Sequence, residues 1–144
     1  MSQRKLSVSE TRRVLNNIPM NKLLGMQISR THGDRVTIEC KIVKRLLNSA
    51  RVLHGWVSAA LADAAVGIAL DHHLGDHRPI TTVEMKINYF RPVKEGRIFA
   101  RSRLLRVGST LCVGRVDLAD GQSRTIGAAL VTSMILSAWP SASS

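Results

Sequence analysis

Aromatic side chains are scarce in this chain of 144 residues, at 3% of the composition. So few aromatics exclude a base-stacking platform for RNA or single-stranded DNA. Zinc-finger spacing and RNP-type sequences are absent as well. We therefore expect no nucleic-acid partner, although 21 Lys and Arg against 10 Asp and Glu give a net charge of +11. That charge suits a phosphate-bearing small molecule or an anionic membrane surface, or serves solubility alone.

Cysteines and long apolar runs are scarce too. The two cysteines, Cys40 and Cys112, lie in segments of alternating polarity, which predicts buried free thiols in a reducing compartment. No run approaches the roughly 20 apolar residues that span a bilayer. No apolar signal core follows Met1–Lys5. We expect a cytoplasmic protein with no membrane partner.

The most distinctive stretch runs from Trp56 to Leu70. Nearly every residue in it is Ala, Val, Leu or Ile, and Asp63 is its single charge, which predicts a helix buried on all sides. Asp is seldom buried without a partner. Asp63 is therefore either a structural cap for a neighbouring element or a group kept for chemistry.

The start of this helix has a second chemical feature. Gly55, after His54, lets another group approach the free N–H donors at the positive end of the helix, which can hold an oxyanion. Gly55 and Asp63 are roughly 12 Å apart along a helix axis, so they cannot serve one small reaction centre. If both act on one bond, an antiparallel helix of a second subunit must supply Asp63. The spacing thus predicts a dimer with two equivalent interfacial sites.

The rest of the chain predicts an α+β protein. A helical extension over residues 1–20 has a helix capped by Ser7 or Ser9 and ended by Pro19. A half-buried hairpin precedes the central helix, which stops at Gly75. The strands expected after it cover 80–91, 97–107, 110–118 and 124–136 and form an antiparallel meander. A curved sheet of five to six strands around one helix in a single domain, 1–144, satisfies this pattern, and 137–144 is expected to fray.

Asp71, His72, His73 and His77 cluster where the helix ends. The composition resembles a metal site, but the spacing matches no recognised zinc motif and adjacent histidines on a helix point in different directions. We interpret these side chains as facing solvent and expect no metal.

Several residues together carry a family resemblance. They are Asn48, His54-Gly55, Leu61-Ala62-Asp63 and the segment from Thr82 to Val93. In this order and spacing the sequence resembles the hotdog-fold acyl-CoA thioesterases of the phenylacetic-acid-degradation (PaaI-like) branch. The similarity extends from about residue 23 to residue 136. It implies the hotdog fold, hydrolysis of an acyl- or aryl-CoA thioester with coenzyme A as part of the substrate and no separate cofactor, and a homodimer or, as in many similar proteins, a homotetramer.

The resemblance also implies roles for individual residues. Asp63 deprotonates a water or attacks the carbonyl directly, and the Gly55 N–H of the other subunit binds the oxyanion. Asn48 orients the water or the carbonyl. Thr82 is expected near the water. Strict alternation, however, places its side chain on the strand face opposite Val83, Met85 and Ile87. Thr82 therefore reaches the site only through a bulge at the strand end, or the neighbouring Thr81 takes its role. His54 is expected to buttress the loop.

Two positions depart from the family pattern. Trp56 stands where a second Gly usually follows His-Gly, and Arg51 stands where Gly is frequent. Trp56 either narrows the acyl channel, stacks on a substrate ring or packs in the core. In the resembling enzymes the region that corresponds to the basic stretch from Arg91 to Arg106 borders the coenzyme A channel, which makes Arg91 and Lys94 candidates for phosphate contacts.

Two other functions stay open. A hotdog dehydratase or hydratase would need a characteristic His and acid arrangement, and Asp63 has no His at helical spacing behind it. A non-catalytic acyl-CoA-binding module would act through protein partners, but the presence of Asp63 and Gly55 favours catalysis.

Overall fold

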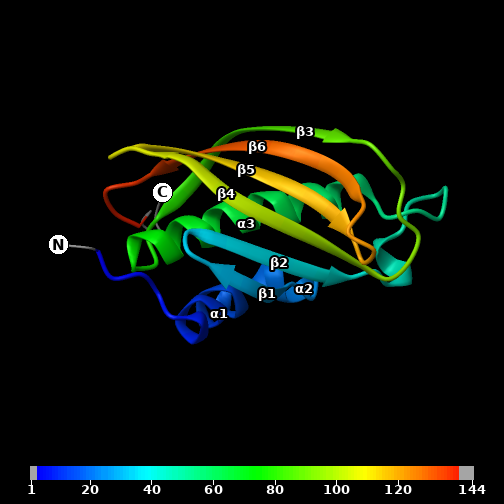
Figure 1. Ribbon diagram of the computed structural model, residues 1–144, viewed down its shortest axis with the longest axis horizontal. Helices are drawn as coiled ribbons and strands as arrows, with labels where there is room; N and C mark the ends of the chain where they lie inside the picture. Colours follow the sequence, from blue (N-terminus) through cyan, green and yellow to red (C-terminus); the bar gives the residue numbers. More distant parts are fainter. Residues whose placement is uncertain (1–2, 140–144) are drawn as a thin grey trace.

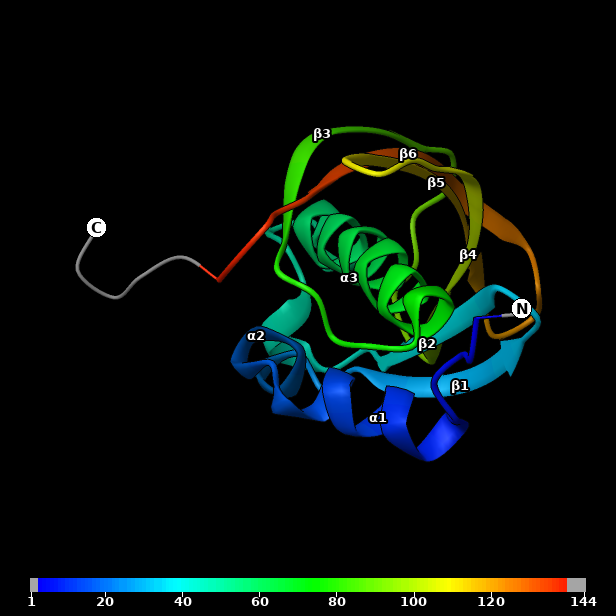
Figure 2. The ribbon, with the colours of Figure 1, turned by 90° about the vertical axis from the view of Figure 1, so that its left-hand side faces the viewer.

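One long helix lies inside a curled sheet. The computed structural model describes residues 3–139, and residues 140–144 of the predicted frayed tail lie outside that range. The helix is α3 (Gly55–Leu74), and it ends in Gly75, whose φ of 73° is left-handed. Viewed along α3, the sheet bends around it from one side to the other (Figure 2). The predicted α+β hotdog fold is confirmed.

Two short helices pack beside one edge of the sheet, and the first of them also contacts α3 (Figure 1). In α1 (Val8–Asn17), Ser7 accepts a hydrogen bond from the Glu10 N–H while the Glu10 carboxylate accepts one from the Ser7 N–H, a capping box. The predicted Ser7 cap is confirmed. Pro19 ends α1 as expected but also begins α2 (Pro19–Leu23), because proline suits the first turn of a helix.

Within residues 3–139 the strands form one six-stranded antiparallel sheet in the order β1-β2-β4-β5-β6-β3. The strands are β1 (Gln27–His32), β2 (Arg35–Lys41), β3 (Ile80–Tyr89), β4 (Arg97–Val107), β5 (Leu111–Asp120) and β6 (Thr125–Ile135). The expected meander from β3 to β6 is wrong at its first step, since β3 pairs with β6 rather than with β4. Two backbone carbonyls of the link between β3 and β4 accept hydrogen bonds from other parts of the chain. The Val93 carbonyl accepts from the Leu53 N–H, and the Gly96 carbonyl accepts from the Ile42 N–H. The link can therefore run from β3 at the edge of the sheet to β4 in its interior, and β3 is an edge strand (Figure 1).

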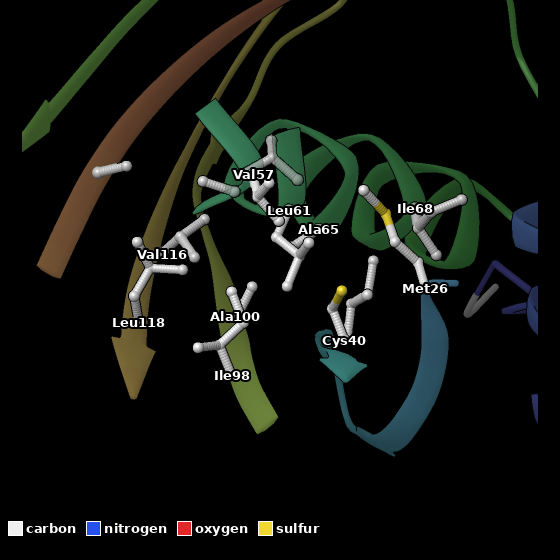
Figure 3. Close-up of a cluster of buried hydrophobic side chains, with 14 of the residues drawn as sticks. Met26, Cys40, Val57, Leu61, Ala65, Ile68, Ile98, Ala100, Val116 and Leu118 are labelled. Carbon is white, nitrogen blue, oxygen red and sulfur yellow. The ribbon is translucent and has the colours of Figure 1, made fainter. Parts of the chain in front are cut away.

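The core lies between α3 and the concave face of the sheet. Leu61, Ala65 and Ile68 of α3 face Ile98 and residues of the neighbouring strands (Figure 3). The prediction that the helix is buried on all sides is wrong for the single chain. A stripe of Ala59, Ala60, Asp63, Ala64 and Gly67 is only half-buried. Small side chains here leave room beside the helix, and a further group must cover an apolar stripe of this kind.

Both cysteines behave as predicted. Cys40 and Cys112 are buried and free. The Cys40 thiol donates to the Leu24 carbonyl over 3.1 Å, and burial raises the pKa of both thiols. No helix in the described part of the chain combines the length and the apolarity that crossing a membrane needs.

In the cluster at the end of α3, Asp71 and His72 do not face solvent, which corrects the expectation for these two residues, whereas His73 is partly exposed and His77 is exposed as expected. His72 is buried and bonds to Thr11 and to the Gly33 carbonyl. His73 pairs with Asp34. Asp71 is 2% exposed. Residues 3–7 and the β1–β2 turn pack over this helix end, and local sequence does not predict this long-range contact.

The contact between α3 and β5 depends on Gly114. A Cβ placed on Gly114 would lie 2.7 and 2.8 Å from the two γ carbons of Val66. We predict that Gly114→Ala lowers the free energy of unfolding by about 1–3 kcal/mol, because the strand must move away from the helix. In urea unfolding at one protein concentration, adding Val66→Ala to Gly114→Ala should restore part of this loss. Gly121→Ala, where a Cβ meets nothing within 4 Å, is the control; an equal effect of both alanines would contradict the packing account.

Candidate active site

The Asp63 carboxylate and the Thr82 hydroxyl form the polar centre of a groove between α3 and β3. Thr82 Oγ1 donates to Asp63 Oδ1 over 2.6 Å. The groove has a volume of about 510 Å³. Its polar lining is Asn21, Asp63, Asp71, His77, Arg78, Thr82 and Ser133. The other lining residues are mostly aliphatic, so the groove joins a few polar side chains to an apolar channel.

A β-bulge brings Thr82 to Asp63. The pairing of β3 with β6 shifts between Thr82 and Glu84, which leaves Val83 as the extra residue. The shift changes which residues of β3 face α3, so that Thr82 lies on the same side as the partly buried Met85. The expected bulge is therefore present, and Thr81 does not replace Thr82 in this contact. Val83 is left 55% exposed at the sheet edge.

The start of α3 presents a donor. The His54 side chain caps the helix by accepting from the Trp56 N–H, and the His54 carbonyl accepts from the Val57 N–H. Within residues 3–139 the structure records no hydrogen bond from the Gly55 N–H. This N–H sits at the positive end of the longest helix described, where an anion is stabilised. His54 thus supports the loop and the helix start, as the sequence predicts.

Tyr89 explains why position 55 is glycine. Its hydroxyl donates to the Gly55 carbonyl over 2.7 Å, and a Cβ on Gly55 would come within 3.1 Å of the Tyr89 ring. Burial raises the pKa of Tyr89, so the phenol stays protonated and donates. Sequence reasoning missed Tyr89, although it is the chain's single tyrosine and lies in the Thr82–Val93 segment.

Gly55 and Asp63 lie in different hollows of the single chain. Gly55 lines a second hollow of about 320 Å³ together with Tyr89 and Arg91, whereas Asp63 lines the groove beside β3. Their spacing on α3 is roughly 12 Å along the axis. One chain therefore holds the two halves of the expected centre apart.

Asn48 has a firm structural role. Its Oδ1 accepts from the Ala50 N–H at 2.9 Å and the Val52 N–H at 3.3 Å, as in an Asx turn. Its contacts among the described residues are within this loop and do not include Asp63. The same loop holds Arg51 at a φ of 59°, a left-handed value that glycine adopts without steric cost.

Trp56 does not pack in the core, which corrects one of the three expectations for it. The side chain is 79% exposed. Its only ring contact in the described chain is the edge of His54, at 5.5 Å between centroids. Trp56 lines a small apolar hollow with Met20 and Leu47. Channel narrowing and ring stacking both stay predictions.

The two basic candidates differ in their surroundings. Arg91 lines the hollow that contains Gly55. Lys94 is exposed in the link between β3 and β4 and lines none of the hollows described here. Two further groove residues were not predicted: Ser133, which pairs with Thr82 across the sheet, and Asp71, whose pKa is raised by burial.

A helix wrapped by an antiparallel sheet, with the Asp63 carboxylate in a groove beside it, is the arrangement expected of a hotdog hydrolase. Residues 50–126, more than half of the chain, match the family model of the Thioesterase superfamily, and the chain belongs to this family. The predicted class of enzyme, a thioester hydrolase, is confirmed at the level of the family.

Individual relatives agree with this assignment. The medium/long-chain acyl-CoA thioesterase YigI of Escherichia coli is 28% identical, over 83% of this chain and 86% of the relative. The putative esterase ComA2 of Bacillus subtilis is 30% identical, over 72% and 82%. Among solved structures, thioesterase HI1161 of Haemophilus influenzae superposes with a TM-score of 0.84 at 22% identity, covering 94% of this chain and 95% of that one. The PaaI protein of E. coli gives a TM-score of 0.78 at 18% identity, covering 92% and 99%; both show the shared fold.

Arg51 provides a test of the loop that holds Asn48. We predict that Arg51→Gly raises the free energy of unfolding by about 1 kcal/mol, because glycine adopts a left-handed φ without steric cost. Ser49→Gly is the control: it lies in the same loop without a positive φ and should lower stability. Thermal unfolding of the two variants decides. An Arg51→Gly variant no more stable than the Ser49→Gly variant would contradict the account.

Proposed function

We propose that this protein hydrolyses acyl-CoA thioesters to the free acid and coenzyme A. The observation that carries the proposal is the half-buried Asp63 carboxylate, which accepts a hydrogen bond from Thr82 in a groove whose other lining is largely apolar along α3. The family membership and the relatives named acyl-CoA thioesterases support the substrate class.

The chemistry needs a base or nucleophile and a donor for the developing oxyanion. The leaving thiolate has a conjugate thiol of pKa about 8.5, so it departs without strong acid help. Asp63 either removes a proton from water or attacks the carbonyl to form an anhydride. In both routes the Thr82 hydrogen bond fixes one carboxylate oxygen, which leaves the other oxygen for the reaction.

We place the complete site between two subunits. Asp63 and the unbonded Gly55 N–H are too far apart in one chain, whereas a two-fold pair of antiparallel α3 helices brings the Asp63 of one subunit near the Gly55 of the other. Two features support this pairing. The half-buried stripe of small residues on α3 needs a cover, and β3 is an unprotected edge strand with Val83, Tyr89 and Phe90 all at least half exposed. A dimer, or a tetramer built from it, satisfies both.

Coenzyme A would approach the Gly55 side. Arg91 shares the hollow with Gly55, and Lys94 follows on the same link, so both are candidates for phosphate contacts. The net charge of +11 raises the local concentration of such a polyanion. Asn48 orients the carbonyl only through its amide nitrogen, since its oxygen is taken up by the loop. The buried free thiols support placing the enzyme in the cytoplasm.

Loss of the Asp63 charge tests the activity itself. We predict that Asp63→Asn lowers kcat by about 10²–10⁴-fold, because an amide keeps the Thr82 contact but cannot act as base or nucleophile. The measurement is thiol release from acyl-CoAs with short, medium, long and aryl acyl groups. Asp117→Asn, at a surface ion pair, is the control.

Two outcomes would contradict this assignment. Saturable coenzyme A binding without turnover of any substrate would show that the protein is a non-catalytic acyl-CoA-binding module. Full activity in Asp63→Asn together with loss of the dimer would leave Asp63 a structural role only.

The oxyanion donor can be removed with little disturbance of the helix. Gly55 is the first residue of α3, where proline is tolerated, and the His54 ψ of 130° suits a residue before proline. We predict that Gly55→Pro, which lacks the N–H, lowers kcat about 10²–10³-fold relative to Gly55→Ala. Both variants bring the same Cβ toward Tyr89, so their comparison isolates the N–H. Equal kcat values in the two variants would exclude this donor.

A further inference from the structure

The far end of the Asp63 groove holds a second polar pair. Asp71 lies eight residues after Asp63 on α3, and both line the groove. Asp71 is 2% exposed. Its Oδ2 lies 2.7 Å from His77 Nδ1, and its Oδ1 accepts from the Arg78 N–H at 3.0 Å. A buried carboxylate with these partners is a firm anchor for the imidazole of His77.

The hydrogen bond to Asp71 determines what His77 offers to a ligand. The carboxylate holds the proton on Nδ1, so Nε2 of the neutral ring is an acceptor. Within residues 3–139 the structure records no hydrogen bond to Nε2. The His77 ring lines the groove and packs against Trp139, with 4.9 Å between ring centroids.

The walls between the two polar ends are apolar. Ala64, Ile68 and Ile80 line the groove along this path, and Trp139 flanks its end. Because the two aspartates are roughly 12 Å apart along the helix, a chain of about eight carbons reaches from a thioester carbonyl near Asp63 to the imidazole. The His77 side chain is 43% exposed, so water solvates Nε2 in the free protein. A plain methyl end would displace this water without replacing its hydrogen bond, whereas a hydroxyl would donate to Nε2.

We propose that the Asp71–His77 pair recognises a terminal hydroxyl on the acyl group, which makes this protein selective for hydroxylated medium-length acyl chains. The proposal rests on the thioesterase function proposed above and specifies its substrate. His77 contacts the substrate, and Asp71 positions His77.

The test compares octanoyl-CoA with ω-hydroxyoctanoyl-CoA. We expect kcat/KM of the wild-type protein to favour the hydroxylated ester about tenfold, chiefly through KM. In His77→Asn the new amide still donates to Asp71 but no nitrogen occupies the Nε2 position, so the ratio of kcat/KM between the two esters should fall to about one. His73→Asn, which alters a histidine that pairs with Asp34 outside the groove, should keep the preference. The same ratio of kcat/KM in the wild-type protein and His77→Asn overturns the proposal.

Calorimetric titration with the two free acids separates this proposal from the thioesterase function. If the wild-type protein cleaves neither ester, the hydrolase assignment fails. Tighter binding of ω-hydroxyoctanoate than of octanoate, lost in His77→Asn, would still support the pair as a hydroxyl site, and equal binding would overturn it. If His77→Asn does not fold, the wild-type comparison decides: no preference for the hydroxylated compound rejects the proposal.

Discussion

Burial of α3 inside the curled sheet is the constraint on which the rest of the structure depends. The helix is apolar on nearly every side, so it is stable only where other groups cover it. The sheet covers most of its circumference and leaves the half-buried stripe that contains Asp63 and Gly67. The sole charge of the apolar helix interior therefore lies at the one place that the fold leaves accessible. Any group that covers this stripe and completes the burial of α3 also contacts Asp63. This holds for a substrate and for a second subunit.

The edge strand β3 provides the side chains that contact Asp63 and the start of α3. It joins the sheet beside β6 rather than beside β4, which brings it along the uncovered stripe. The bulge at Val83 then turns Thr82 toward Asp63. At the other end of β3, Tyr89 packs on Gly55 and holds the helix start. One strand thus positions both the carboxylate and the helix terminus, and its own outer edge is available for pairing with another chain.

Much of this arrangement can be predicted from the sequence. The apolar run around Asp63 predicts the helix, and alternation predicts the strands. The separation of eight positions between Gly55 and Asp63 predicts that one chain cannot complete the site. Other features depend on long-range packing and have no local signal. The path of the β3–β4 link, the burial of His72 beneath residues 3–7, and the Asp71–His77 pair in the groove are of this kind. The exposure of Trp56 could not be predicted from the sequence either. An aromatic residue at the start of an apolar helix fits a buried position as well as an exposed one.

The central claim is that one site takes Asp63 from one subunit and Gly55 from the other. Mixed dimers of Asp63→Asn and Gly55→Pro chains, formed by co-expression with two affinity tags, measure this directly. The account predicts that the mixed dimer recovers about half of the wild-type kcat, because one of its two sites has both wild-type residues, while each parental dimer stays nearly inactive. A mixed dimer as inactive as its parents would mean that both residues act within one chain, and it would contradict the account.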